Sequence, residues 1–228
     1  MGASDSVTTQ RSTLHEWTQA LAESKGFPGG GAAAGVMLSI AASLTSMVAG
    51  YTEPAEHHRE DLADIRSRAQ ALAEEALQLA DDDAAASEAF GAAFRKQAGP
   101  ERQRAIEEAS VFAAEASAAL GTKAIAAIDD LEWLAVNGKS ALIADVAVAL
   151  GALRAAMVGA RTNVSFDLHT LTSAGNTLQQ IEKDHPRLWN TVTRLNTALD
   201  RVDDIVHGID HRAAPTDTAV TPSDPERH

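Results

Sequence analysis

The sequence predicts an all-α fold, a single-domain antiparallel bundle of long helices that dimerises through helices. Apolar residues recur at helical spacing along most of the chain, and the alternation typical of strands is hardly present. No internal repeat and no Pro- or Ser-rich linker interrupts residues 11–211, which favours one helical domain. Glycine and proline divide this domain, and the expected helices cover about 14–23, 32–50, 54–94, 100–138, 140–158, 164–181 and 186–211.

The two ends of the chain are expected to differ from the helical domain. Residues 1–10 are predicted to be a flexible N-terminus, and they lack the basic and apolar regions of a secretory signal. Residues 212–228 turn to Ala, Pro, Thr, Ser and Asp, a composition that buries too little apolar surface to order itself. We therefore expect a disordered tail there.

Composition and charge exclude several classes of function. Lys and Arg total 19 against 32 Asp and Glu, for a net charge of −13, so we expect neither nucleic acid nor a membrane surface as a partner. The chain has no cysteine, which excludes disulfides, thiolate zinc sites and cysteine nucleophiles. These features are compatible with a cytoplasmic protein.

The segment 32–50 carries two apolar stripes on one helix. Its small stripe consists of Ala32, Gly35, Ser39, Ala42, Ser46 and Ala49, and its larger stripe of Met37, Ile40, Leu44 and Met47. Small side chains let another helix backbone approach closely. The segment is long enough to span a membrane but only weakly hydrophobic, so it indicates a buried helix. A helix with two apolar faces lies either at the centre of a bundle or against a second subunit, and we expect a homodimer.

Two aspartates fall on stripes that face the core. Asp83 continues the apolar spacing of Leu79, Ala86 and Phe90, provided that one helix runs through Asp81–Asp83. A carboxylate in such a place must be paired, hydrogen-bonded or protonated, and such groups cluster at active sites. The alternative is that the helix breaks here and one aspartate caps a new helix.

Asp145 repeats this pattern nearer the C-terminus. It shares a stripe with Ala141 and Ala149, so it is expected to face a closely packed region. Lys139 could supply a positive charge near it. The alternatives are a first-turn aspartate favoured by the helix dipole and a solvated lysine in a loop.

The sequence offers no metal site. His207 and His211 have the i, i+4 spacing of a metal pair, as do His57 and Asp61, but no third ligand accompanies either pair. We therefore expect no metal and no tightly bound cofactor.

The glycines of Pro28-Gly29-Gly30-Gly31 precede the small-residue helix. No Walker loop, serine elbow or dinucleotide fingerprint is present. Backbone N–H groups at such a helix start can hold an anion or a developing oxyanion. The alternative is a flexible hinge in front of a buried helix.

Three stretches together resemble the cyclodeaminase/cyclohydrolase family, which includes the C-terminal domain of formiminotransferase-cyclodeaminase and stand-alone methenyltetrahydrofolate cyclohydrolases. They are FPGGGAAAGVMLSIAASLTSMVAGYT, LADDDAAASEAFGAAFRK with Asp83, and AVALGALRAAMVGARTNVSFDL with Gly159, Ala160, Asn163 and Val164. The similarity covers roughly 14–181.

The resemblance implies a dimeric all-helical enzyme whose folate site is lined by the Gly-rich loop and by helices from both subunits. It implies a small-molecule substrate, a tetrahydrofolate derivative, in which a C–N bond of an amidine-like group is made or hydrolysed. Proton handling would fall to Asp83 and Asp145, orientation to the Asn163 amide, and substrate binding to Pro28 and the glycines after it.

This chain departs from the family pattern at several polar positions. Residues 138–145 read GKSALIAD, where the family usually has Gly-Asn-x-Asn-x-x-Ser-Asp, and Ser87 replaces a usual phenylalanine. Ser165-Phe166-Asp167 stands where the family tends to have an apolar residue followed by Ile-Asn. One interpretation is a divergent folate cyclodeaminase or cyclohydrolase. The other is the same fold used on a non-folate small molecule in specialised biosynthesis, as a ring-forming or ring-opening enzyme or as a non-catalytic binding protein.

Overall fold

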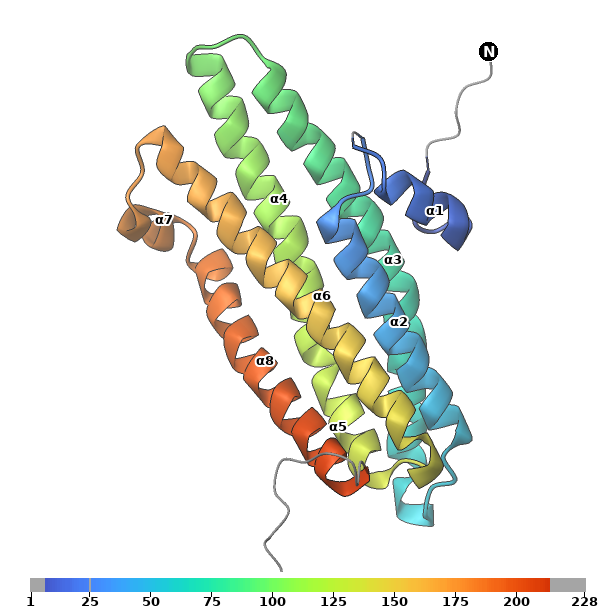
Figure 1. Cartoon of the computed structure of the whole chain (residues 1–228). Helices are drawn as coiled ribbons and strands as arrows, with labels where there is room; N and C mark the ends of the chain where they lie inside the picture. Colours follow the sequence, from blue (N-terminus) through green and yellow to red (C-terminus); the bar gives the residue numbers. More distant parts are fainter. Residues whose placement is uncertain (1–6, 25, 214–228) are drawn as a thin grey trace, which may run out of the picture.

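The protein is an antiparallel bundle of long helices, seen in a computed structural model that describes residues 7–24 and 26–213 (Figure 1). No strand occurs in these residues, which confirms the predicted all-α fold. The α-helices are α1 (Leu14–Leu21), α2 (Gly30–Tyr51), α3 (Arg59–Arg95), α4 (Pro100–Ala126), α5 (Ile128–Asn137), α6 (Ile143–Thr170), α7 (Leu178–Asp184) and α8 (Pro186–Ala213). Short 3₁₀ turns are η1 (Glu56–His58), η2 (Ser140–Leu142) and η3 (Leu171–Ala174).

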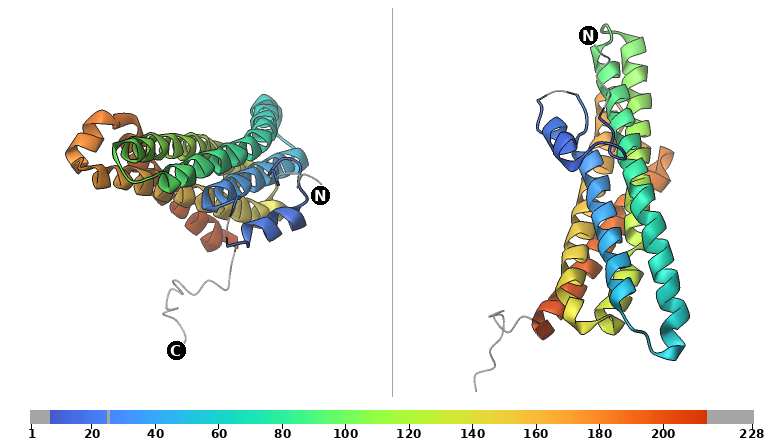
Figure 2. Two further views of the ribbon diagram at one scale, coloured as in Figure 1. Left: turned by 90° about the horizontal axis from the view of Figure 1, so that it is seen from above. Right: turned by 90° about the vertical axis from the view of Figure 1, so that its right-hand side faces the viewer.

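Helix α6 is central to the bundle. It contacts α2, α4, α5 and α8, while α3 packs on α2 and α4 (Figures 1 and 2). The largest fully buried side chains of the main core include Leu38, Val48, Leu150, Leu153, Met157 and Leu195. The cores of α2, α6 and α8 therefore form one continuous apolar cluster, which fixes how these helices sit against each other.

Three of the predicted helix boundaries were wrong. The helix expected over 164–181 is divided, because α6 ends at Thr170 and α7 begins at Leu178. We expected a break at 159–163, but α6 continues through it. Gly159 instead allows a close approach, since a Cβ there would lie 2.8 Å from the Cβ of Ala34 on α2. We expected one helix over 100–138, but the chain turns at Ala127, whose N–H donates to the Ala124 carbonyl oxygen at 3.2 Å in a tightened turn.

Helix α3 passes through Asp81–Asp83 without a break, which resolves the alternative of a helix cap there. Asp82 is exposed, while Asp83 is 7% exposed and points into the bundle. The prediction from helical spacing that Asp83 points inward is confirmed.

The N-terminal segment contacts the bundle ahead of α1. The Thr9 N–H donates to Asp81 Oδ1 at 2.6 Å, and Trp17 Nε1 donates to Thr9 Oγ1 at 3.1 Å. Residues 1–6 of the predicted flexible segment and 214–228 of the predicted tail lie outside the described residues.

The small stripe of α2 is packed against its neighbours, as the sequence predicted. A Cβ on Gly35 would lie 2.7 Å from the Ala80 Cβ and 2.9 Å from the Ala76 carbonyl oxygen. One turn on, the Ser39 hydroxyl donates to the Ala73 carbonyl oxygen at 2.9 Å. Glycine and serine thus let the α2 and α3 backbones approach closely near the start of α2.

We expect Gly35→Ala to lower the free energy of unfolding by about 1–3 kcal/mol, because the added methyl group meets α3 backbone that cannot move alone. Urea unfolding measures the change. Gly208→Ala is the matched control, since a Cβ there meets nothing within 4 Å and α8 gains helix propensity. Equal effects of both substitutions would contradict the close contact.

The larger stripe of α2 is exposed only in its first half, because Leu44 and Met47 are half-buried against the main core. Met37 and Ile40 are 40% and 42% exposed, and Val148 on the adjacent α6 is 60% exposed. Within one chain, the expectation that both faces of α2 are buried therefore holds for the small stripe but fails for the first half of the larger stripe. By length and composition, Gly30–Tyr51, Pro100–Asn137 and Ser140–Ser173 could each cross a membrane, although half of the most apolar window of the first is buried by other helices.

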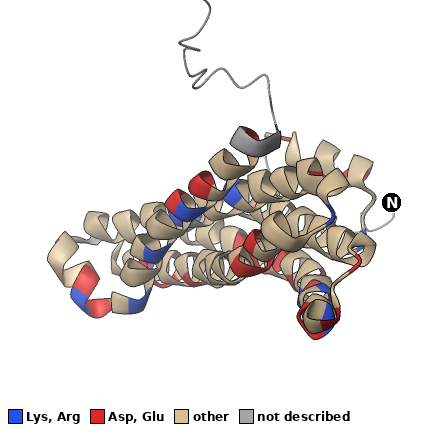
Figure 3. Cartoon of the chain, turned by 90° about the horizontal axis from the view of Figure 1, so that it is seen from below, with Lys and Arg blue, Asp and Glu red and all other residues tan. Residues whose placement is uncertain are grey.

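Apart from Asp83 and Asp167, the charged side chains of the described residues are not buried. In the view from the end where α5 lies, Lys and Arg are interspersed with Asp and Glu (Figure 3). One bidentate ion pair joins Arg154 on α6 to Asp203 on α8, with N–O distances of 2.6 and 2.9 Å. Being exposed, it contributes little to stability.

Candidate active site

A cavity of about 190 Å³ lies where the start of α2 meets α3, α4 and α6. Its polar lining consists of Asp83, Ser87, Ser117, Asn163 and Asp167, and the backbones of Gly30 and Gly31 border it. Larger hollows of about 460 and 660 Å³ lie between α4 and the α7–α8 connection. None of their carboxylates is buried, since Glu115 and Asp184 are exposed and Glu107 is half-buried, so the smaller cavity is the better candidate for chemistry.

The first turn of α2 is built around the Asp83 carboxyl group. A Cβ on Gly31 would overlap that carboxyl group, so glycine is required for this approach. The next residue, Ala32, donates its backbone N–H to Asp83. The first turn of α2 therefore lies directly against the buried Asp83 side chain. One of the backbone N–H groups that could bind an anion already donates to Asp83.

Burial and hydrogen bonding act in opposite directions on the pKa of Asp83. Burial raises the pKa of the Asp83 carboxyl above its ordinary value, and hydrogen bonds from the Ala32 N–H and the Ser117 hydroxyl act in the opposite direction. The net pKa is raised because desolvation is the largest of these effects. A buried carboxyl group with a raised pKa is a candidate for exchanging protons with a substrate.

Asp167 is a second buried carboxyl at the same cavity. It is 9% exposed, and burial, followed by the negative charge of Asp83, raises its pKa to about 7. Among the described residues, none forms a hydrogen bond or ion pair with the Asp167 side chain. The two carboxyl groups therefore disfavour each other's charged forms.

We expect Asp167→Asn to raise the melting temperature more at pH 8 than at pH 5. Because the pKa of Asp167 is higher in the folded state than in the unfolded state, the folded state holds this proton more tightly. The free energy of unfolding therefore falls as pH rises from about 4 towards 7. Asparagine removes that loss. Thermal unfolding at both pH values tests this, with the exposed Asp200→Asn as control, for which we expect the same small effect at both pH values. An Asp167→Asn gain that does not grow with pH would contradict it.

Three of the sequence-predicted residues other than Asp83 reach this cavity. Asn163 lines it from α6, and Gly30 and Gly31 border it. Pro28 is buried just before α2, and Gly29 occupies the cap position of that helix, but neither is on the cavity lining.

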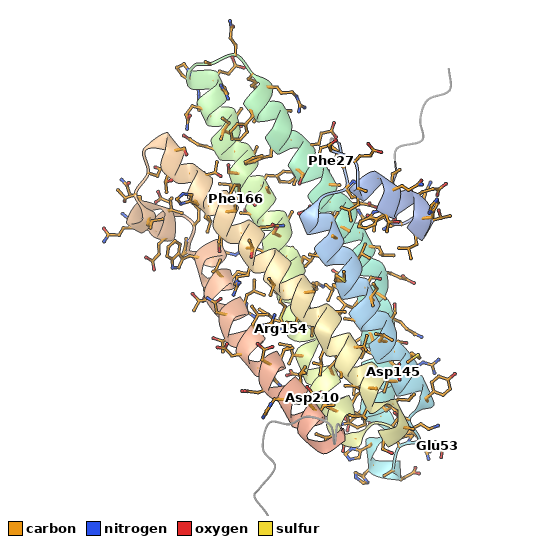
Figure 4. The ribbon with its side chains drawn as sticks, in the orientation of Figure 1. Phe27, Glu53, Asp145, Arg154, Phe166 and Asp210 are labelled. Atoms are coloured by element: carbon orange, nitrogen blue, oxygen red, sulfur yellow. The ribbon has the colours of Figure 1, made fainter. Side chains whose placement is uncertain are left out.

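Asp145 and Lys139 lie at the other end of the bundle. Asp145 is half-buried in the first turn of α6 near Glu53, and Phe166 marks the opposite end of that helix (Figure 4). The 18 residues from Asp145 to Asn163 span about 27 Å of helix. The expectation that Asp83 and Asp145 face one pocket is therefore wrong within a single chain.

Lys139 makes local contacts at that far end. Its backbone N–H donates to Thr52 Oγ1 at 3.1 Å, and its Nζ lies 5.9 Å from the centre of the Tyr51 ring. Its side chain is exposed and does not line the cavity around Asp83.

Sequence reasoning missed Asp167 and Ser117 as site residues. Asp167 falls on the buried face of α6 with Val164 and Leu168, at the same helical spacing that singled out Asp83, so the signal was present. Ser117 is a small residue on an alanine-rich helix, and nothing in the sequence distinguishes it from the alanines around it.

No group of three or more potential metal-binding side chains occurs in residues 7–24 and 26–210, where side chains are described. The side chain of His211, which has the i, i+4 spacing of a metal pair with His207, lies outside that range. At the cavity, two carboxyl groups, two hydroxyls and a carboxamide can instead donate and accept protons and hydrogen bonds around a small polar group.

Comparisons with known proteins agree with this architecture. A solved structure of formiminotetrahydrofolate cyclodeaminase from Thermotoga maritima matches with a TM-score of 0.72 and 23% identity, covering 87% of this chain and 98% of that one. At this identity the match shows a shared fold. No curated protein sequence matches. The family model described as formiminotransferase-cyclodeaminase matches residues 13–184, about three quarters of the chain. The chain belongs to the formiminotransferase-cyclodeaminase family.

Proposed function

We propose that the protein is a cyclodeaminase of the folate type, which closes a ring at the amidine-like carbon of a formimino-tetrahydrofolate and releases ammonia. The observation that carries this is Asp83, a buried carboxyl with a raised pKa at a cavity between α2, α3, α4 and α6. Family membership and the likeness to the formiminotetrahydrofolate cyclodeaminase of Thermotoga maritima support the substrate class.

Ring closure requires a proton to move between two nitrogens. The second nitrogen attacks the amidine carbon, and the resulting tetrahedral carbon carries three nitrogens. The attacking nitrogen must lose its proton and the departing nitrogen must gain one before ammonia leaves. Asp83 accepts the first proton and returns it to the leaving group, and the Asn163 carboxamide orients the reacting amidine.

The direct test is turnover by the purified protein. Given formimino-tetrahydrofolate, we expect one ammonia per methenyl-tetrahydrofolate formed, measured by absorbance and by a coupled ammonia assay. Cyclohydrolase activity would appear instead as loss of methenyl-tetrahydrofolate without ammonia. Turnover of a non-folate cyclic amidine alone would favour the second interpretation of the sequence, and binding without turnover of either would leave only the binding role.

We further propose a homodimer formed by the exposed apolar face of α2 and α6, which includes Met37, Ile40 and Val148. Both helices extend along the bundle between the cavity end and the Asp145 end. A two-fold axis across them pairs opposite ends, so Asp145 of the partner subunit would lie at the cavity end of this chain. This arrangement gives Asp145 and Lys139 a route to the site that a single chain lacks.

Light scattering at micromolar concentration should report about twice the chain mass of 23.9 kDa. Ile40→Asp should give monomers, because it places a charge in an apolar interface. Phe112→Asp is the control, since Phe112 is a similarly exposed apolar residue on α4. A wild-type monomer would contradict the dimer. If the site is shared, mixed dimers of Asp83→Asn and Asp145→Asn should regain about a quarter of wild-type turnover, because half of the dimers carry one intact site.

A further inference from the structure

We propose that Asp83 and Asp167 form a carboxyl pair that binds a cationic, planar nitrogen group, an amidinium or a ring of the same charge, and that Asp167 selects the cation over a neutral amide. This rests on the proposed function for the identity of the reacting group and adds its charge state. Asp167 becomes a specificity residue of the site.

The first argument is geometric. Asp83 on α3 and Asp167 on α6 reach one cavity from different helices, and both are more than nine-tenths buried. Asp83 has hydrogen-bond partners in Ala32 and Ser117, whereas the Asp167 side chain has none among the described residues. A buried carboxyl without a partner, facing a cavity, leaves a place for a ligand that can donate to it.

The second argument is the missing positive charge. The polar groups that line the cavity with Asp167 are the α2 backbone at Gly30 and Gly31, Asp83 and Ser87 on α3, Ser117 on α4 and Asn163 on α6. No Lys, Arg or His is among the described residues that line the cavity. Two carboxylates in this setting repel each other, so the pair tends to hold a proton. A bound cation would offset the negative charge and replace that proton.

The third argument concerns the shape of the cation. A planar group with N–H donors on two edges can bridge carboxyl groups that approach from different helices, and the Asn163 carboxamide offers a further acceptor. A cavity of about 190 Å³ has room for such a group with little surrounding water. A neutral amide of the same outline has a carbonyl oxygen on one edge, and that oxygen would face a carboxyl group.

Acetamidine hydrochloride and acetamide are matched probes of charge with nearly the same shape. Calorimetric titration at pH 8 should show millimolar affinity for acetamidinium, in keeping with its four heavy atoms, and at least about tenfold weaker binding of acetamide. Asp167→Asn should bind acetamidinium at least about tenfold more weakly, whereas exposed Asp200→Asn should match wild type. Below pH 7, titrations in buffers of different ionisation enthalpy should reveal proton release on binding, which should fade towards pH 8.

Equal affinity for the two probes, or acetamidinium binding unchanged in Asp167→Asn, would overturn the proposal. Tighter binding of Mg²⁺ than of acetamidinium, lost in the same variant, would also overturn it in favour of a metal site. Turnover is measured separately: a wild type that binds acetamidinium but leaves formimino-tetrahydrofolate unchanged refutes the proposed function and keeps the cation site. Folate turnover without charge selection does the reverse.

Discussion

Asp83→Asn should lower turnover by about 10²- to 10⁴-fold, the usual cost of removing a group that carries protons in the transition state. Asparagine keeps the shape of the side chain. Its carbonyl oxygen can still accept from the Ala32 N–H and its NH2 group can donate to the Ser117 hydroxyl, so the fold should survive. It also removes a buried carboxyl whose pKa is raised, which should leave stability equal or higher at neutral pH. Steady-state kinetics with formimino-tetrahydrofolate and thermal unfolding measure both quantities.

The neighbouring aspartate provides a matched control for Asp83. Asp82 lies on the exposed side of α3 and accepts a hydrogen bond from Gln78 at 2.9 Å. Asp82→Asn makes the same chemical change one residue away, and we expect turnover close to wild type. If Asp83→Asn unfolds the protein while leaving the turnover of its folded fraction intact, Asp83 is structural and the proposed mechanism fails.

Gly31→Ala should lower turnover by about tenfold to a hundredfold with little loss of stability. The added methyl group takes the place now held by the Asp83 carboxyl group, which must rotate away. That group is the free end of a flexible side chain, so the movement costs the fold little. It costs catalysis much more, because misplacing a reacting group by about 1 Å can lower rates about 10²-fold.

Gly29→Ala is the control for this substitution. A Cβ on Gly29 meets nothing within 4 Å, and its backbone is extended, with φ −126° and ψ −163°. We expect turnover close to wild type and a stability change of about 1 kcal/mol or less. The double variant Gly31→Ala/Asp83→Asn isolates the mechanism: if Gly31 acts through Asp83, the double variant should be no slower than Asp83→Asn alone. Additive losses would mean that Gly31 contacts substrate itself.

These two glycines also decide between the loop and hinge interpretations of Gly29–Gly31. A hinge would tolerate Gly31→Ala and Gly29→Ala alike, since both residues lack a positive φ. The contact between Gly31 and Asp83 predicts a difference between them. The glycine motif therefore borders the cavity, as Gly30 and Gly31 show. Gly31 is singled out among its glycines because α3 places the Asp83 carboxyl group against it.

Helical periodicity alone determined much of this protein. The all-α class, the packed small stripe of α2 and the inward direction of Asp83 all follow from spacing along one helix. The start of α8 at Pro186 follows from a different signal, since proline is favoured in the first turn of a helix. Such spacing fixes direction because each residue advances the helix by a constant angle. The break expected at 159–163 failed for a related reason: Gly159 permits a turn, but it equally permits a close approach, and the neighbouring Ala34 selects the second.

Only the tertiary structure decided which side chains meet. Asp83 and Asp145 both face inward by the same spacing, yet one lies at the cavity and the other at the far end of α6. Asp167, seen in the sequence only as a departure from the family pattern, lies at the cavity with Asp83. The physical reason is that direction around a helix is local, whereas position along the bundle depends on the length and register of helices packed against each other, which many distant contacts fix together.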